Sequence, residues 1–293
     1  MKKLFFILLV LEISTSVLFA EKYNIASYNV RNANESDSIA GNAWSKRMPY
    51  MAKLIKFHDF DLFGTQEGKL RQLQDLMTAL PEYEYIGVGR DNGKQAGEHS
   101  AIFYKKDKFK VLDHGDFWLS ETPEKPSKGW GARYNRICSW GKFKDIKHKK
   151  TFLVFNLHLD HQSNKARSEG VKLVLKKIQE QPRHIPVVLI GDFNVDQNSE
   201  PYKVLNNSGI LKDTYDKAEF KYVMNETFDS QRIDHIFVTD DFKVKKYGVL
   251  TDCYQDYSKP AKKFTRFYFG MDIMQYEGRK PSDHFPVLTV LEL

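Results

Sequence analysis

The distribution of apolar residues along the chain is typical of a protein rich in strands. Short runs of aliphatic, β-branched and aromatic residues recur throughout, and several are apolar at successive positions. Such runs indicate strands that are buried on both faces. The segments predicted as strands are Tyr23–Val30, Phe60–Thr65, Tyr83–Val88, Ser100–Lys105, Lys110–Leu119, Arg136–Phe143, Thr151–His158, Val187–Gly191, Gln231–Thr239, Phe242–Leu250 and Phe285–Leu291.

Helical spacing of apolar residues appears between these strands. Met48, Met51 and Leu54 lie on one face of a predicted helix, and Pro81 and Pro182 each follow a predicted helix that they cannot continue. The predicted helices are Ala43–Phe57, Lys69–Leu80, Asn164–Gln181 and a short one near Glu200–Asn206.

The order of these elements predicts an α+β fold. The strands outnumber the helices and fall into two groups, with helices between them. Two mainly antiparallel sheets packed face to face, with helices on their outer sides, would bury these strands on both faces. The sequence therefore predicts a four-layer α/β sandwich, with one functional site at one edge of the sheets.

Five short motifs carry the candidate chemistry, and most of them follow an apolar strand-like run. They are Thr65-Gln66-Glu67, Asn156-Leu157-His158-Leu159-Asp160, Gly191-Asp192-Phe193-Asn194, Arg232-Ile233-Asp234-His235 and Ser282-Asp283-His284. Carboxylates and amides without a cysteine among them suit a hard cation, Mg²⁺ first and Mn²⁺ as the alternative. Imidazoles beside such a cation suit the charge that develops on a phosphoryl group under attack.

Each motif also has a purely structural explanation. Glu67 ends an apolar strand and can extend toward a metal, but a glutamate at a helix start is also favoured by the helix dipole. Asp192 and Asn194 are two residues apart, so an extended turn would place them on one side, where the carboxylate accepts a proton from water and the amide orients it. In isolation, the same pair would be an Asx turn that closes a strand.

The first residues have the layout of a secretory signal peptide. A basic start at Lys2 and Lys3 precedes the apolar run 4–11, and Ala20 stands before a polar Glu21. We expect cleavage after residue 20 and an exported protein, periplasmic or secreted, without a membrane span. No linker or repeat interrupts residues 21–293, which are predicted to form a single domain.

Net charge and cysteine content add little to the prediction of fold and function. The formal charge of +7 favours an anionic partner. Cys138 and Cys253 are the two cysteines, and they could pair after export. The surroundings of Cys138 read as a buried strand, however, where a free thiol packs as a small apolar group.

The ordered motifs, together with Phe117-Trp118-Leu119-Ser120-Glu121-Thr122-Pro123, Arg136-Ile137-Cys138-Ser139-Trp140 and His158-Leu159-Asp160-His161, carry a family resemblance. From Asn29 to Val287, the chain resembles the endonuclease/exonuclease/phosphatase superfamily, and in particular secreted bacterial members of it. The resemblance implies the DNase I-like form of the four-layer sandwich.

The same resemblance implies roles for individual residues. Glu67 would be the principal Mg²⁺ ligand with Asn29 alongside, and Asp283 would lie beside the metal or the attacking water. His158 and His284 would contact the non-bridging oxygens of the phosphate.

Three further residues complete the implied catalytic group. Asp234 would hold the tautomer of His284, and Asp192 and Asn194 would activate and orient the water.

Substrate contacts are implied less directly. Arg136 could contact a phosphate in a bidentate way, or it could be a structural arginine paired with a carboxylate. Trp130 is expected to be exposed near the substrate, and Asp160 is a candidate substrate-binding or supporting residue. For the remaining histidines no firm role follows: His161 and His235 could support the site, His235 could simply pack under the sheet, and at His99 relatives often carry an aromatic residue.

The segment from Tyr254 to Arg279 mixes basic and aromatic residues. Lys259, Lys262, Lys263 and Arg266 alternate with Phe264, Phe267, Tyr268 and Phe269. Such mixing suits single-stranded nucleic acid or a phosphorylated ligand, but a solvated hairpin with a few apolar anchors would look the same.

The sequence thus predicts an exported, Mg²⁺-dependent phosphoesterase that works by direct in-line attack of water. No serine or cysteine nucleophile setting accompanies the carboxylates, which argues against a covalent intermediate. Nuclease and small-molecule phosphatase activities remain open, and no protein partner is implied. A catalytically silent module that binds a phosphorylated ligand is the non-enzymatic alternative, and a calcium-stabilised structural domain is disfavoured because the acidic residues are dispersed.

Overall fold

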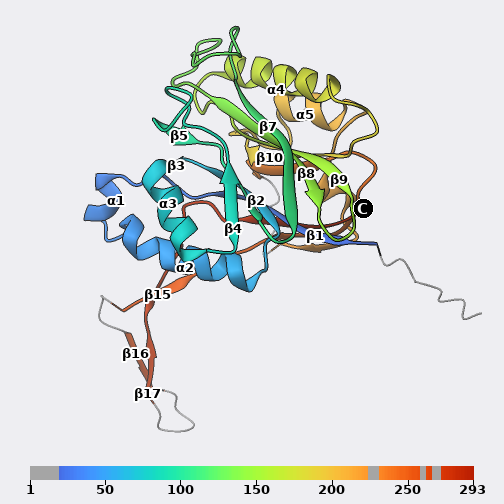
Figure 1. Ribbon diagram of the computed structural model, residues 1–293. Coiled ribbons are helices and arrows are strands. Elements are labelled where there is room, and N and C mark those ends of the chain that lie inside the picture. Colours follow the sequence, from blue (N-terminus) through green and yellow to red (C-terminus); the bar gives the residue numbers. More distant parts are fainter. Residues whose placement is uncertain (1–19, 224–230, 258–261, 266–271) are drawn as a thin grey trace, which may run out of the picture.

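Two sheets form the centre of the computed structural model, which describes residues 20–223, 231–257, 262–265 and 272–293 (Figure 1). The first sheet has, in spatial order, β12 (Phe220–Tyr222), β14 (Lys243–Val249), β19 (Val287–Glu292), β1 (Lys22–Asn29), β2 (Leu62–Gln66), β6 (Ile102–Lys105) and β4 (Tyr83–Ile86). The second has β11 (Lys212–Asp213), β13 (Asp234–Val238), β10 (Val187–Asp192), β9 (Thr151–His158), β8 (Ile137–Asp145) and β7 (Phe109–Trp118).

Helices cover the outer face of each sheet. On the first sheet lie α2 (Trp44–Phe57) and α3 (Leu70–Ala79), and on the second lie α4 (Asn164–Gln179) and α5 (Glu200–Asn206) (Figure 1). The two sheets are mainly antiparallel, with parallel pairing at β1–β2, β9–β10 and β12–β14. The predicted four-layer sandwich is therefore confirmed.

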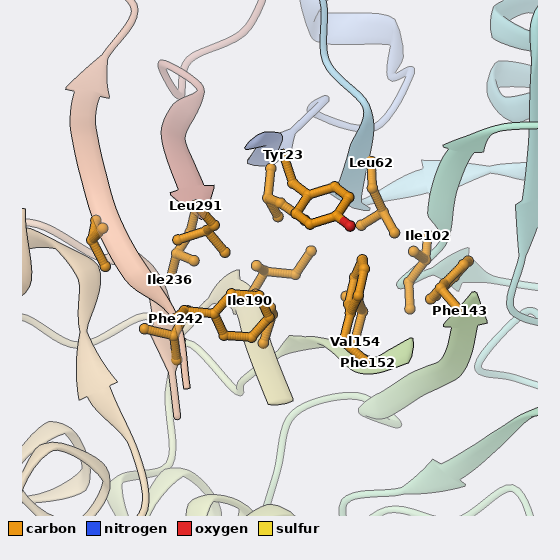
Figure 2. Close-up of a cluster of buried hydrophobic side chains, with 14 of the residues drawn as sticks. Tyr23, Leu62, Ile102, Phe143, Phe152, Val154, Ile190, Ile236, Phe242 and Leu291 are labelled. Carbon is orange, nitrogen blue, oxygen red and sulfur yellow. The ribbon is translucent and has the colours of Figure 1, made fainter. Parts of the chain in front are cut away.

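Three buried apolar clusters hold the four layers together. Tyr23, Leu62, Phe152 and Ile190 belong to the cluster between the sheets (Figure 2), and each outer face has a cluster of its own. Successive strand residues point to opposite faces, so that Leu62 enters the central cluster while the next residue, Phe63, packs under the helices. Apolar residues at successive positions are thus required by burial on both faces.

Several helices begin after a residue whose side chain caps the first turn. Ser163 and Ser199 cap α4 and α5, since each side-chain oxygen accepts a hydrogen bond from a backbone N–H of the first turn. The short α1 (Glu35–Ile39) was not predicted; Asn34 caps it in the same way, and its five residues are too few to show a helical period.

The remaining described elements are small. They are β3 (Gly68–Lys69), β5 (Glu98–His99), α6 (Thr214–Lys217), β15 (Tyr254–Asp256), β16 (Lys262–Thr265), β17 (Asp272–Gln275) and β18 (Glu277–Arg279). The ribbon of β16 and β17 stands away from the body of the domain in Figure 1. Lys259, Arg266 and Phe267–Phe269 of the predicted basic and aromatic segment lie outside the described residues, as do residues 1–19 of the predicted signal peptide.

Both cysteines are free thiols. Cys138 is buried in β8 and Cys253 is exposed, so the alternative of a disulfide is not realised. Within the described ranges, none of the helices combines the length and the apolar character that crossing a membrane requires.

A buried amide connects the two sheets directly below one edge. Asn156 of β9 donates from Nδ2 to the carbonyl oxygens of Thr65 and Ala101, at 2.9 Å each, and its Oδ1 accepts from Gln66 Nε2 at 2.7 Å. Because all three partners belong to the other sheet or its connection, these bonds fix the position of one sheet against the other. A buried polar group of this kind is costly to leave unpaired, which favours a single arrangement.

Gly64 makes this approach possible, which yields a test. A Cβ at this position would lie 2.6 Å from both Asn156 Cγ and Ile190 Cδ1. Gly64→Ala should therefore lower the free energy of unfolding by about 1–3 kcal/mol, as measured by urea denaturation. Gly278→Ala is the control, since a Cβ there meets nothing within 4 Å; equal stability of the two variants would contradict tight contact at Gly64.

Candidate active site

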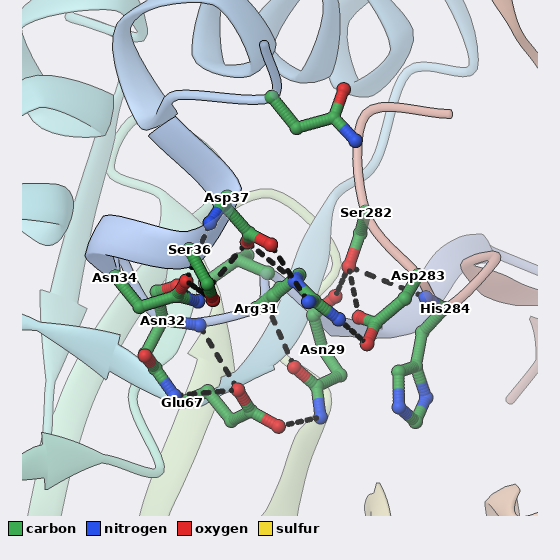
Figure 3. A network of polar contacts seen from close by, with 12 residues as sticks. Asn29, Arg31, Asn32, Asn34, Ser36, Asp37, Glu67, Ser282, Asp283 and His284 are labelled. Atoms are coloured by element: carbon green, nitrogen blue, oxygen red, sulfur yellow. Dashed lines mark hydrogen bonds and ion pairs between the residues drawn. The ribbon is translucent and has the colours of Figure 1, made fainter. Parts of the chain in front are cut away.

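The predicted catalytic residues converge at one edge of the sandwich. Parallel pairing brings the ends of β1 and β2 together in one sheet and the ends of β9 and β10 together in the other. The loop before β19 reaches the same edge (Figure 3). The residues that meet there are Asn29, Glu67, His158, Asp192, Asp234 and His284.

Asp192 lies at the centre of this group. Its Oδ2 accepts a hydrogen bond from Asn29 Nδ2 at 3.0 Å and lies 3.5 Å from His158 Nε2 and 3.8 Å from His284 Nε2. Its Oδ1 accepts from the backbone N–H of Asn194 at 2.9 Å. Burial, followed by the charge of Asp234, raises the pKa of Asp192 to about 7. A carboxyl with that pKa can exchange a proton near neutral pH.

Glu67 is held in place by the strand end of the neighbouring β1. Asn29 Nδ2 donates to its Oε1 at 3.1 Å, and the backbone N–H and Nδ2 of Asn32 both donate to Oε2 at 3.0 Å (Figure 3). The helix-start alternative does not apply, since Glu67 lies between β2 and β3.

Left-handed backbone conformations gather at this edge. Arg31 has φ 52°, Glu67 has φ 65° and Asn194 has φ 50°, and each follows the end of a central strand within two residues. Residues other than glycine rarely adopt this conformation, and it is frequent at functional sites. Here it turns the chain sharply out of the sheet at the point where the side chains must meet.

The two histidines carry different charges. Although burial alone would lower it, the charge of Asp234 and the 2.7 Å hydrogen bond between Asp234 Oδ2 and His284 Nδ1 raise the pKa of His284 to about 10. Burial, and then the charges of Arg136 and Arg90, hold the pKa of His158 well below its usual range. At neutral pH, His284 is therefore an imidazolium and His158 a neutral imidazole.

The donor atoms fit a divalent cation. Single ligand atoms of Glu67, His158 and Asp192 lie within 4.8 Å of one another, which gives two carboxylates and one imidazole. A second group of Asp192, Asp234 and His284 is equally compact, but its imidazole is an imidazolium bonded to Asp234 and has no free lone pair for a metal. The group that contains Glu67 is therefore the one whose donor atoms could hold a cation.

Asp283, which the resemblance implies to lie beside the metal or the attacking water, takes part in an ion pair. Its carboxylate makes a close ion pair with Arg31, which also binds Asp37, and its side chain is 47% exposed (Figure 3). Among the described residues it belongs to neither of the compact groups that contain Asp192. It lies at the rim, next to His284.

Arg136 and Asp160 contact each other inside the fold. Arg136 is buried, with Nε 3.5 Å from Asp160 Oδ2 and Nη2 2.9 Å from His161 Nδ1. Asp160 also accepts hydrogen bonds from the backbone N–H groups of Gln162 and Ser163. The structural alternative for Arg136 is thus the geometry observed, and its charge acts on His158 from a distance.

Trp130 does not match the prediction of an exposed side chain. It is only partly exposed and packs against the apolar cluster between the second sheet and its helices. Ser163 holds the loop by donating to the Trp130 carbonyl at 2.9 Å. The observed contacts of Trp130 are therefore mainly those of core packing.

Asn194, implied to orient the water, and two of the histidines of uncertain role make hydrogen bonds to backbone carbonyls. Asn194 donates from Nδ2 to the Leu159 carbonyl, so it ties the ends of β9 and β10 together. His235 is buried and bonds the Val195 carbonyl at 3.0 Å, which matches packing under the sheet. His99 is buried against the Gly68 carbonyl, beside Glu67.

Three residues of this region were missed from the sequence. Arg31 and Asn32 follow Asn29 at the end of β1. The repeated asparagines in this segment could have indicated a polar site there. Arg47 is buried in α2 and donates to the carbonyl oxygens of Val30, Arg31, Asn42 and Pro281. The signal for Arg47 was a charged residue on the apolar face of a predicted helix.

The Asp234–His284 pair makes a testable prediction. In Asp234→Asn, the pKa of His284 should fall from about 10 toward its ordinary value of 6.5, since the opposing charge is lost and burial remains. NMR titration of the imidazole resonances measures this shift. The raised pKa also means that the pair stabilises the fold fully below pH 6.5, and that this contribution is lost as the pH rises through about 10. Asp240→Asn, at an exposed carboxylate, is the control; a His284 pKa that stays near 10 in Asp234→Asn would exclude Asp234 as its cause.

Comparison with known proteins gives a consistent family. The model of the Endonuclease/Exonuclease/phosphatase family matches residues 26–284. A mannosyl-6-phosphatase from Bacteroides thetaiotaomicron VPI-5482 is 49% identical, with a TM-score of 0.83 over 92% of this chain and 100% of that chain. An endonuclease/exonuclease/phosphatase from Bacteroides vulgatus is 36% identical, with a TM-score of 0.79 over 93% and 99% of the two chains.

A viral protein extends the likeness beyond bacteria. The uncharacterized protein L388 of Acanthamoeba polyphaga mimivirus is 27% identical over 85% of this chain and 92% of its own length. The family match covers every strand end that supplies the site, from Asn29 to His284. The chain therefore belongs to the endonuclease/exonuclease/phosphatase family, whose members are metal-dependent phosphoesterases.

Proposed function

We propose that this phosphoesterase hydrolyses the phosphate monoester of a sugar, that it uses Mg²⁺, and that it acts after export. The observation that carries the proposal is the position of Asp192, which lies between a neutral histidine, a cationic histidine and the amide of Asn29. The 49% identity to a mannosyl-6-phosphatase supports a phosphorylated sugar as the substrate.

The side chains at the strand ends divide the chemistry among them. Asp192, with a pKa near 7, accepts the proton of a water that attacks phosphorus in line with the leaving oxygen. His284 has its Nδ1 bonded to Asp234, so its Nε2–H is directed to the phosphoryl oxygens and compensates their growing charge. The carboxylate of Glu67 would hold the cation, which would supply Lewis acidity to the phosphoryl group and leave Asp192 free to act as the base.

These observations bear on two alternatives that the sequence left open, a catalytically silent binding module and a nuclease. A catalytically silent binding module would not need Asp192, His158 and His284 in one compact group. The basic and aromatic segment that motivated the nuclease alternative is described only in part, and its described strands β16 and β17 stand away from the body of the domain (Figure 1). A phosphatase is therefore the better supported activity.

Substrate and cation are tested together. Phosphate release from mannose 6-phosphate, glucose 6-phosphate and p-nitrophenyl phosphate should require Mg²⁺ or Mn²⁺ and should cease after chelation. The same protein is incubated with bis(p-nitrophenyl) phosphate and plasmid DNA, on which it should be much slower. Full activity after exhaustive chelation, or cleavage of DNA alone, would refute the proposal.

The assignment of Asp192 has its own test. Asp192→Asn keeps the shape of the side chain but cannot accept the proton, so kcat on the best monoester should fall by about 10²–10⁴-fold. Asp240→Asn is the matched control, because it makes the same chemical change at a carboxylate on the surface. Near-normal kcat in Asp192→Asn would show that this carboxylate is structural.

Export is tested on secreted material. The mature protein should begin near Glu21, and N-terminal sequencing of the exported fraction checks this. Recovery of Met1 on exported protein would overturn the signal-peptide assignment.

A further inference from the structure

Two cavities flank the loop that carries His284. The smaller, of about 210 Å³, is lined by Asp234, His284, Tyr247 and Phe285 among others. The larger, of about 480 Å³, lies against α1 and β18, and its volume is within the range of about 300–1,000 Å³ that is usual for ligand sites. Lys280 and Asp283 line both cavities, so the two meet at the loop before β19.

We call the larger cavity the β18 hollow. Its lining residues are Arg31, Asp37, Ala40, Asn42, Arg47, Glu277, Gly278, Arg279, Lys280, Ser282 and Asp283. It opens at the rim of the catalytic group, since Ser282 Oγ donates to the Asn29 carbonyl at 2.6 Å and Asp283 is next to His284 (Figure 3).

The arginines of the β18 hollow are held by groups of the protein itself. Arg31 binds Asp37 and Asp283, and Arg279 Nε lies 2.6 Å from Asp256 Oδ2. Arg279 Nη1 also donates to Asn42 Oδ1 at 2.6 Å, which ties the two walls of the hollow together.

The two remaining cations have other partners. Arg47 donates to four backbone carbonyls, and the Lys280 ammonium lies 4.7 Å from the centre of the Phe285 ring.

These pairings indicate which class of ligand the β18 hollow could bind. A polynucleotide backbone needs several uncompensated lysines or arginines along its path. The β18 hollow instead presents closely spaced donors and acceptors with little net charge, which is suited to the hydroxyl groups of an uncharged sugar.

The direction of the reaction points to the same cavity. Asp192, which accepts the proton of the attacking water, belongs to β10 of the second sheet. In-line displacement requires the leaving oxygen on the opposite side of phosphorus. Arg31 and Asp283 line the β18 hollow and belong to loops of the first sheet, opposite the sheet of Asp192, so we expect the leaving group on their side.

We propose that the β18 hollow binds the leaving group of the reaction, and that this leaving group is an uncharged sugar chain of more than one unit. The proposal rests on the proposed function and extends it. The phosphorylated sugar would lie beside His284, and the units attached to it would lie between α1 and β18. The substrate class is thus a 6-phosphorylated oligosaccharide rather than a free sugar phosphate.

Gly278 offers a way to fill the β18 hollow without touching the catalytic group. A Cβ at this residue meets nothing within 4 Å, and its backbone is not in the left-handed region, so a large side chain can be introduced. Because Gly278 is part of the lining, Gly278→Trp is expected to narrow the hollow, and Gly278→Ala is the matched variant with a small side chain. Lys280→Ala, which removes a side chain shared by both cavities, is an independent second variant.

The measurement compares two substrates in each variant. kcat/KM is determined for a 6-phosphorylated mannotriose and for p-nitrophenyl phosphate, which has no sugar chain. The ratio of the two values should fall by about tenfold or more in Gly278→Trp, because remote binding energy is lost for the oligosaccharide alone, and it should keep its wild-type value in Gly278→Ala. Turnover of p-nitrophenyl phosphate also reports that Gly278→Trp has folded. Lys280→Ala should lower the ratio in the same direction.

A binding measurement separates this inference from the proposed function. Unphosphorylated mannotriose, titrated by NMR, should bind the wild-type protein and Gly278→Ala and should lose binding in Gly278→Trp. If the wild-type protein hydrolyses none of the monoesters, the proposed function fails. If it hydrolyses them but the substrate ratio and mannotriose binding are unchanged in Gly278→Trp, the sugar-chain site is excluded.

Discussion

A hydrogen bond from Asn29 Nδ2 to Asp192 Oδ2 joins the end of a strand in one sheet to the end of a strand in the other. Asn29 ends β1 and Asp192 ends β10, so the bond exists only if the two sheets stand at one particular offset. The Asn156 amide, buried below, sets that offset through its bonds to Thr65 and Ala101. Since a slip of one residue in a strand would reverse the facing of every side chain on it, the site depends on the register of the sandwich.

Placing several ionisable groups at this edge would be unfavourable without the pairing observed. Asp192 and Asp234 repel each other, and the imidazolium of His284 lies between them. His158, in contrast, is kept neutral by burial and by the nearby arginines. The fold thus keeps one histidine neutral and the other positively charged, and the difference follows from the burial of each ring and from the charged groups around it.

Much of this arrangement could be predicted from the sequence, because an apolar run that stops at a polar residue marks the end of a buried strand. Glu67, His158 and Asp192 each follow such a strand, and all three meet at one edge. Asp283, Arg136 and Trp130 were harder, since their neighbours are chosen in three dimensions: Arg31 binds Asp283, Asp160 and His161 bind Arg136, and an apolar cluster receives Trp130. The spacing of residues along the chain does not predict these contacts, and it does not predict the burial of Arg47.

The pairing of β1 with β19 has a consequence for how the protein matures. These strands are the first and the last of the described sheets, and Arg47 fastens the loop after one to the loop before the other. Contacts so distant in sequence form slowly, because most of the chain must be closed into a loop before they appear. A chain that emerges from its N-terminus therefore has no complete catalytic group until its final residues arrive, and truncation near the C-terminus removes activity and a central strand together.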